Sequence, residues 1–105
     1  MTEAVLFFGR NIAEDGMVSE AQWSKFAATT LKATFPDGFT VIDGAGSWRD
    51  PDTGEAAREP SKIVIVALAD SAALASGLQT AMSAYRAEFH QKAVGVVTRK
   101  VCAAF

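Results

Sequence analysis

The chain has 105 residues, half of them apolar, with a formal net charge of −2 and a pI near 5.3. This length is typical of one hydrophobic core, so residues 1–105 are expected to form a single domain. The acidic balance leaves no cationic surplus to neutralise phosphates, which disfavours nucleic-acid binding.

The first residues and the cysteine content bear on location. Residues 1–8 have no basic region, and their apolar run is too short for a signal peptide or a membrane span. Cys102 is the single cysteine, so no intrachain disulfide can form and a reducing compartment is favoured. One His and one Cys do not make a zinc site. The expectation is a cytoplasmic protein with no membrane partner, no metal and no cofactor.

The chain begins with a strand and a helix. Residues 4–10 are a continuous apolar run of strand length, and residues 11–17 have the composition of a polar loop. Ser19, with Gln22 three positions later, is typical of a helix N-terminus with a capping box. Apolar side chains then recur at helical spacing as far as Phe35, which predicts one amphipathic helix.

Two strands are predicted in the middle of the chain. Residues 39–48 are rich in β-branched side chains, but Gly44 and Gly46 weaken the second half and indicate a bulge or a sheet edge. Residues 49–59 are predicted to be a long polar connection. Residues 62–69 are again continuously apolar, as in a strand buried on both faces.

The last two elements complete a recognisable order. Asp70 or Ser71 is expected to cap a helix that runs to Phe89, and residues 93–98 form a final strand. The order strand, helix, strand, strand, helix, strand is that of a ferredoxin-like βαββαβ sandwich. Right-handed crossovers then place the first and third strands at the centre of a four-stranded antiparallel sheet. Both helices would cover one face of this α+β fold.

The other face of the predicted sheet carries alternate apolar residues of the two central strands. These side chains would meet water in a monomer, which is unfavourable for a large contiguous patch. A second copy is the simplest partner, because two identical faces can pack against each other about a two-fold axis. The expectation is a homodimer through the helix-free sheet face.

Six short motifs occur in fixed order and together resemble a bacterial family of unknown function. They are Phe8-Gly9-Arg10, Val18-Ser19 with Trp23 and Phe26, Phe35 to Val41, Gly46-Ser47-Trp48, Arg58-Glu59-Pro60-Ser61-Lys62, and Tyr85 with Phe89, Gln91 and Val94. The resemblance covers nearly the whole chain. It implies a ferredoxin-like fold of the dimeric α/β-barrel kind and implies no activity. Exported relatives of this family would carry a leader.

Three basic residues lie at the ends of predicted strands. Arg10 ends the first strand, and Arg58 and Lys62 precede the third. Such cations can hold a carboxylate or phosphate in a pocket. The alternative is structural, with Arg10 in an ion pair to Glu59 or Asp43.

Glu59 and four aromatic residues complete the candidate site. Glu59 could act as a general base if burial raised its pKa, or it could bridge its basic neighbours. Trp23, Phe26, Trp48 and Tyr85 could line a pocket between helices and sheet, or they could simply fill the core. No residue is assigned a catalytic role.

Two functions remain open on this basis. The first is a homodimeric protein that binds a small acidic or aromatic ligand, either as a binding protein or as a cofactor-independent enzyme. It rests on analogy with other proteins of the same predicted fold, many of which bind or convert small molecules. The second is a non-catalytic structural or protein-interaction module. A pocket of at least roughly 300 Å³ with converging polar groups would favour the first.

Overall fold

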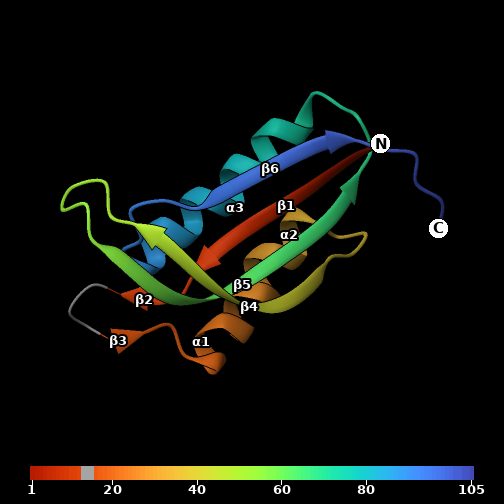
Figure 1. The fold of residues 1–105 in the computed structure, drawn as a ribbon. Coiled ribbons are helices and arrows are strands. Elements are labelled where there is room, and N and C mark those ends of the chain that lie inside the picture. The colour runs from red at the N-terminus through yellow and green to blue at the C-terminus, as the bar shows by residue number, and fades with distance from the viewer. Residues whose placement is uncertain (13–15) are drawn as a thin grey trace.

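Four antiparallel strands form the main sheet in the order β4-β5-β1-β6 (Figure 1). The computed structural model describes residues 1–12 and 16–105. The strands are β1 (Thr2–Gly9), β4 (Thr40–Arg49), β5 (Ala56–Leu68) and β6 (Gly95–Lys100). The two continuously apolar strands, β1 and β5, are central, as predicted. β4 is an edge strand, which agrees with the glycines in its second half.

The helices cover one face of this sheet, and the opposite face is free of them (Figure 1). The first helical segment runs without a break through α1 (Glu20–Phe26), a π-helical stretch (Ala27–Leu31) and α2 (Lys32–Thr34). The second is α3 (Ala73–Phe89). Within the described part of the chain, none of the helices is both long enough and apolar enough to cross a bilayer.

The predicted start of the first helix is confirmed in detail. The hydroxyl of Ser19 accepts a hydrogen bond from the backbone N–H of Gln22, and the side chain of Gln22 accepts one from the backbone N–H of Ser19. Each bond satisfies a donor that the helix itself leaves free. In the turn after the helix, Gly38 adopts a φ of +125°, which other residues rarely adopt.

The prediction of a polar loop over residues 11–17 is wrong at both ends of this segment. Asn11–Ile12 (β2) and Gly16–Met17 (β3) pair as a short antiparallel ribbon. Residues 13–15, in the middle of the predicted loop, lie outside the described residues. Val18 N–H donates to the carbonyl of Arg10 at 2.7 Å and so extends this pairing toward α1.

The prediction of a long connection over residues 49–59 is also wrong, because β5 begins at Ala56. β4 and β5 pair in register from Thr40 opposite Ile65 to Arg49 opposite Ala56. Cross-strand hydrogen bonds therefore hold a polar segment in strand conformation that its composition did not indicate. The remaining loop closes with Asp50 N–H donating to the carbonyl of Glu55 at 2.8 Å.

The second helix begins later than predicted and without a side-chain cap. Its N-cap residue is Ala72, whose side chain makes no capping hydrogen bond. Asp70 instead accepts a hydrogen bond from the hydroxyl of Thr2 and forms an ion pair with Lys100 at 2.8 Å. These two bonds lower the pKa of Asp70 to about 2. The carboxylate therefore links the start of β1 to the end of the neighbouring strand β6 and does not cap the helix.

The core lies between the helices and the sheet. Side chains alternate along β1, so that Ala4, Leu6 and Phe8 are fully buried on the helix-covered face. Phe8 contacts an aromatic cluster contributed by the two helical segments. The ring centroids of Phe8 and Tyr85 are 4.8 Å apart, and those of Phe26 and Tyr85 are 5.1 Å apart. This cluster fixes the helices against the end of the sheet where the candidate site lies.

Candidate functional site: a pocket on the helix-free face

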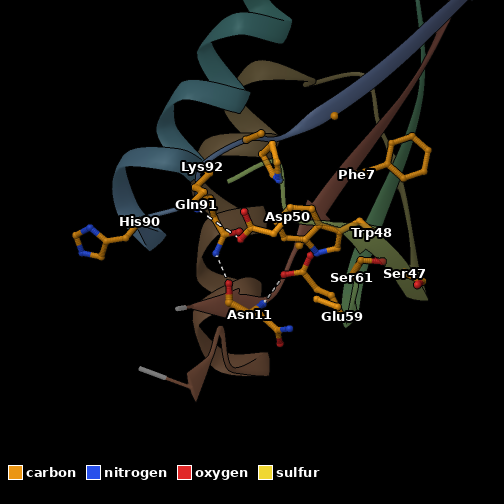
Figure 2. A pocket seen from close by; sticks show the side chains of 16 residues that line it. Phe7, Asn11, Ser47, Trp48, Asp50, Glu59, Ser61, His90, Gln91 and Lys92 are labelled. Carbon is orange, nitrogen blue, oxygen red and sulfur yellow. Dashed lines mark hydrogen bonds and ion pairs between the residues drawn. The ribbon is translucent and has the colours of Figure 1, made fainter. Parts of the chain in front are cut away.

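A pocket of about 550 Å³ lies at one end of the sheet, on the face that carries no helices. It is bounded by the ends of β1 and β6, the β4–β5 hairpin and the turn after α3 (Figure 2). The residues that line it include Phe7, Gly9, Asn11, Trp48, Glu59 and Ser61. This volume is within the range of small-molecule sites in proteins.

The hollow results from a row of small residues that crosses three strands. Gly44 on β4 lies opposite Ser61 on β5, and Ser61 lies opposite Gly9 on β1. Gly46 lies opposite Glu59 one row further on. The space beside Gly44 is occupied by the side chains of Ile63 and Ser61. Because side chains in one row point to the same face of a sheet, Gly9, Gly46 and Ser61, which line the pocket, leave a depression in the helix-free surface. Trp48 rises at its edge with 41% of its surface exposed.

Glu59 places its carboxylate over the glycine at the end of β1. A Cβ atom added to Gly9 would lie 2.5 to 2.8 Å from the three carboxylate atoms of Glu59. The backbone N–H of Asn11 donates to Oε2 of the same carboxylate at 3.0 Å. Gly9 is therefore required for a close approach, which explains why a glycine ends the first strand.

Asn11 is itself held from both sides. Its side-chain amide donates to the carbonyl of Arg58 at 3.2 Å, and its carbonyl accepts from Nε2 of Gln91 at 2.8 Å (Figure 2). Gln91 follows His90, which ends α3 with a φ of 53° and turns the chain toward the pocket. The imidazole of His90 points away from the other labelled side chains in Figure 2. The turn after α3 thus supports the carboxylate site through Asn11.

The hairpin loop forms the polar rim of the pocket. Lys92 lies 3.6 Å from a carboxylate oxygen of Asp50 and 2.8 Å from one of Asp52. Hydrogen bonds from the backbone N–H groups of Asp52 and Thr53, together with the charge of Lys92, lower the pKa of Asp50. Asp50 is therefore already engaged with its own loop and with Lys92.

Of the residues proposed from sequence as ligand contacts, Trp48 and Glu59 both line this pocket. Arg58 is exposed and borders a separate shallow hollow at Gly46, Glu59 and Pro60. The sequence motifs that contain Trp48 and Glu59 are brought together because β4 pairs along its whole length with residues 56–65 of β5.

Trp23, Phe26 and Tyr85 lie on the opposite side of the sheet, in the aromatic core. None of them has more than 4% of its surface exposed. The hydroxyl of Tyr85 donates to the carbonyl of Gly9 at 2.7 Å. Burial raises the pKa of this hydroxyl, and the negative charge of Glu59 raises it further. The pocket thus lies on the helix-free face, whereas the sequence expectation placed it between helices and sheet, where these aromatic rings are packed.

Arg10 and Lys62 form an ion cluster with two carboxylates. Arg10 donates through two guanidinium nitrogens to the carbonyl of Val18 and lies 3.2 Å from Glu20. The ammonium of Lys62 contacts both Glu20, at 2.9 Å, and Asp43. Glu20, in the first turn of α1, is therefore the ion-pair partner of Arg10 that the sequence did not indicate. Hydrogen bonds and charge raise the pKa of Lys62 and lower that of Asp43.

This cluster predicts a pH dependence of stability. The pKa of Asp43 is lowered in the folded protein, so its ion pair stabilises the fold above the usual aspartate range and is lost as the pH falls through the lowered value. Asp43→Asn should therefore reduce the midpoint of urea unfolding at pH 7. The midpoints of variant and parent should converge at an acid pH at which Asp43 is protonated in both the folded and the unfolded protein. An equal difference at both pH values would show that the charge of Asp43 is not responsible.

The sequence did not single out Gly9, Asn11 and Ser61 as site residues. Gly9 and Ser61 belong to motifs from which only the charged residues were proposed as ligand contacts. Asn11 was assigned to a loop. The usable signal was the presence of small residues on neighbouring strands at the same end of the sheet. That signal becomes readable only when the strand register is known.

Gly9→Ala should displace the carboxylate of Glu59 while leaving the fold intact. The obstructing atoms are the end of a flexible side chain, so the free energy of unfolding should fall by less than about 1 kcal/mol. The amide resonance of Asn11 should shift, because its N–H loses its acceptor. Gly46→Ala is the matched control, since its Cβ would approach no atom closer than 3.5 Å. An unchanged Asn11 resonance in Gly9→Ala would contradict the placement of Glu59.

Comparison with known proteins places the chain in a family. The chain belongs to a family of proteins of unknown function, DUF3574, whose model matches residues 3–105. No curated protein matches the chain.

Solved structures with the same fold include two of a phage SAM lyase. The complex with S-methyl-5′-thioadenosine has a TM-score of 0.77 and 16% identity, with 94% of this chain and 80% of the lyase chain covered. The apo state has a TM-score of 0.75 and 18% identity, with 93% and 78% covered. At these identities the similarity concerns the fold.

Proposed function

We propose that this protein binds a small aromatic molecule of about nucleoside size in the pocket on the helix-free face. The observation that carries the proposal is the joint placement of Trp48 and a fixed Glu59 beside a floor of small residues. An exposed indole offers a stacking surface, and a held carboxylate fixes the orientation of a ligand. The use of this fold by a phage SAM lyase bound to S-methyl-5′-thioadenosine supports a nucleoside as the first probe.

The proposal departs in one respect from the sequence expectation of an acidic ligand. Arg10 and Arg58 were expected to select an anion, with Lys62 nearby. Arg10 and Lys62 are engaged by Glu20 and Asp43, and Arg58 does not line the pocket. A neutral aromatic ligand is therefore favoured over an acidic one. If the protein is an enzyme, the carboxylate of Glu59 is a candidate proton acceptor in the pocket.

Titration of ¹⁵N-labelled protein with S-methyl-5′-thioadenosine tests this function. Amide shifts at Gly9, Asn11 and Ser61 are expected to saturate together. Trp48→Ala should weaken the binding about ten-fold, because stacking on an aromatic side chain contributes roughly 1–3 kcal/mol per base. A second titration with benzoate tests the acidic class. Absence of shifts at these amides with both compounds would contradict the function.

We further propose that the protein is a ferredoxin-like domain that forms a dimer through the helix-free face. Beyond the pocket, this face carries apolar side chains on all four strands, among them Ile42, Ile65, Val5 and Val97. Ile42 and Val97 have 47% and 58% of their surfaces exposed. Burial of such a patch against a second copy would remove it from water. Phe7 lies both in this surface and in the pocket wall, so the two sites adjoin.

A structural or protein-interaction module is the second candidate. It is favoured by the aromatic rings of Trp23, Phe26 and Tyr85, which fill the space between helices and sheet where the sequence predicted a pocket. A dimer in which neither compound causes shifts at the pocket would support this candidate.

A further inference from the structure

The charge distribution in the pocket shows which ligands it favours, provided that the proposed binding function holds. Among the described residues, four with ionisable side chains line it: Asp50, Glu59, His90 and Lys92. Asp50 and Lys92 are paired at the rim, and the ring of His90 is turned away. Among the described residues, no cationic side chain lies within ion-pair distance of the Glu59 carboxylate. Glu59 is therefore the uncompensated charge of the pocket.

The carboxylate is held in place before any ligand arrives. Oε2 of Glu59 accepts the backbone N–H of Asn11, whose carbonyl and side chain are in turn bonded to Gln91 and to Arg58. The described residues provide no hydrogen-bond donor to Oε1, which can accept an interaction from a ligand. A group that is already oriented loses little conformational entropy on binding, so its interaction contributes more to affinity.

The surroundings of Glu59 strengthen its effect on a nearby charge. Glu59 is half-buried, and its neighbours in the pocket include Trp48, Phe7 and Ala57, which offer apolar surface. Charges interact more strongly where water is partly excluded. An indole face also attracts cations through its ring quadrupole. Both features favour positive charge in the space beside the aromatic side chain.

We infer that the pocket selects ligands that carry a positive charge next to a planar aromatic ring system, with Glu59 as the counter-ion and Trp48 as the stacking surface. The cation replaces the missing ion-pair partner of Glu59. The ring occupies the hollow that Gly9, Gly46 and Ser61 leave open. Onium groups such as sulfonium or quaternary ammonium fit this chemistry, since they interact by charge and need no hydrogen-bond acceptor.

A matched pair of nucleosides tests the inference. S-methyl-5′-thioadenosine is neutral at sulfur, and 5′-deoxy-5′-(dimethylsulfonio)adenosine differs by one methyl group and one fixed positive charge. Calorimetric titration at pH 7.5 and low salt should show the sulfonium compound binding about 5- to 10-fold more tightly. In Glu59→Gln, which keeps the shape of the side chain, this preference should fall to below about 2-fold while the neutral compound still binds.

The outcomes separate the inference from the proposed function. Equal binding of the two compounds to the parent protein would overturn the charge preference and leave the aromatic binding function intact. A preference that persists in Glu59→Gln would overturn the role of Glu59. If a protein with an unchanged HSQC spectrum bound neither compound, both the inference and the nucleoside-binding function would be overturned. Asp52→Asn, on the rim, is the control for a general loss of negative charge and should keep the preference.

Discussion

Phe26→Ala is expected to lower the free energy of unfolding by about 3–5 kcal/mol, the usual cost of truncating a buried phenylalanine. Phe26 has 1% of its surface exposed and contacts the rings of Phe8, Trp23, Tyr85 and Phe89. Its removal leaves a cavity where the two helical segments meet the sheet. Because domains of this size are stable by only about 5–15 kcal/mol, urea or thermal unfolding should show a large shift.

Two controls make this result specific to the core. Phe105→Ala removes a fully exposed ring and should change the stability by less than about 0.5 kcal/mol. Phe26→Leu keeps most of the volume and should cost much less than the alanine variant. If Phe26→Ala were as stable as the parent but no longer bound the nucleoside, Phe26 would belong to a ligand site instead of the core.

Val97→Lys is expected to convert the proposed dimer into a monomer. Val97 lies on β6, directly opposite Val5 on β1, and points to the helix-free face with 58% of its surface exposed. A lysine is tolerated there in the monomer, since it can extend into water. In a dimer of facing sheets its ammonium would lose hydration without gaining a partner, which strongly opposes association.

Analytical ultracentrifugation checks this expectation. The parent should sediment with about twice the chain mass of 11.1 kDa, and Val97→Lys with the mass of one chain. Thr98→Lys is the matched control, because Thr98 is an exposed neighbour on the opposite face of the same strand. A parent that sediments as a single chain would contradict the dimer. Dissociation by Thr98→Lys but not by Val97→Lys would place the interface on the other face.

The arrangement of the long strands could be predicted because local pattern and tertiary role agree there. β1 and the second half of β5 are continuously apolar, and both are central in the sheet. The first half of β5, from Ala56 to Ser61, is polar and contains Pro60, so its composition indicated a loop. It is a strand because it pairs with β4, and this pairing is a tertiary contact that a local pattern cannot reveal.

The candidate site was predicted in part for a related reason. Trp48 and Glu59 were both named from sequence, but their common pocket depends on the register of β4 and β5. The sequence could not show that the basic residues of the expected anion site are already paired. Glu20 contacts Arg10 and Lys62 only in the folded chain. Trp23, Phe26 and Tyr85 illustrate a further limit: helical periodicity shows that side chains share a face, and only packing shows whether space remains between them.

The small residues on the helix-free face determine how deep the pocket is. At Gly9, Gly46 and Ser61 the backbone itself, or a single hydroxymethyl group, forms part of the pocket wall. A methyl group added at Gly46 would approach no atom closer than 3.5 Å and would make the pocket shallower, whereas one added at Gly9 would displace the carboxylate of Glu59. The depth of the pocket therefore depends on which small residues occupy these three positions. In this architecture the size limit on a ligand is set by absent side chains, and it can be adjusted one carbon atom at a time.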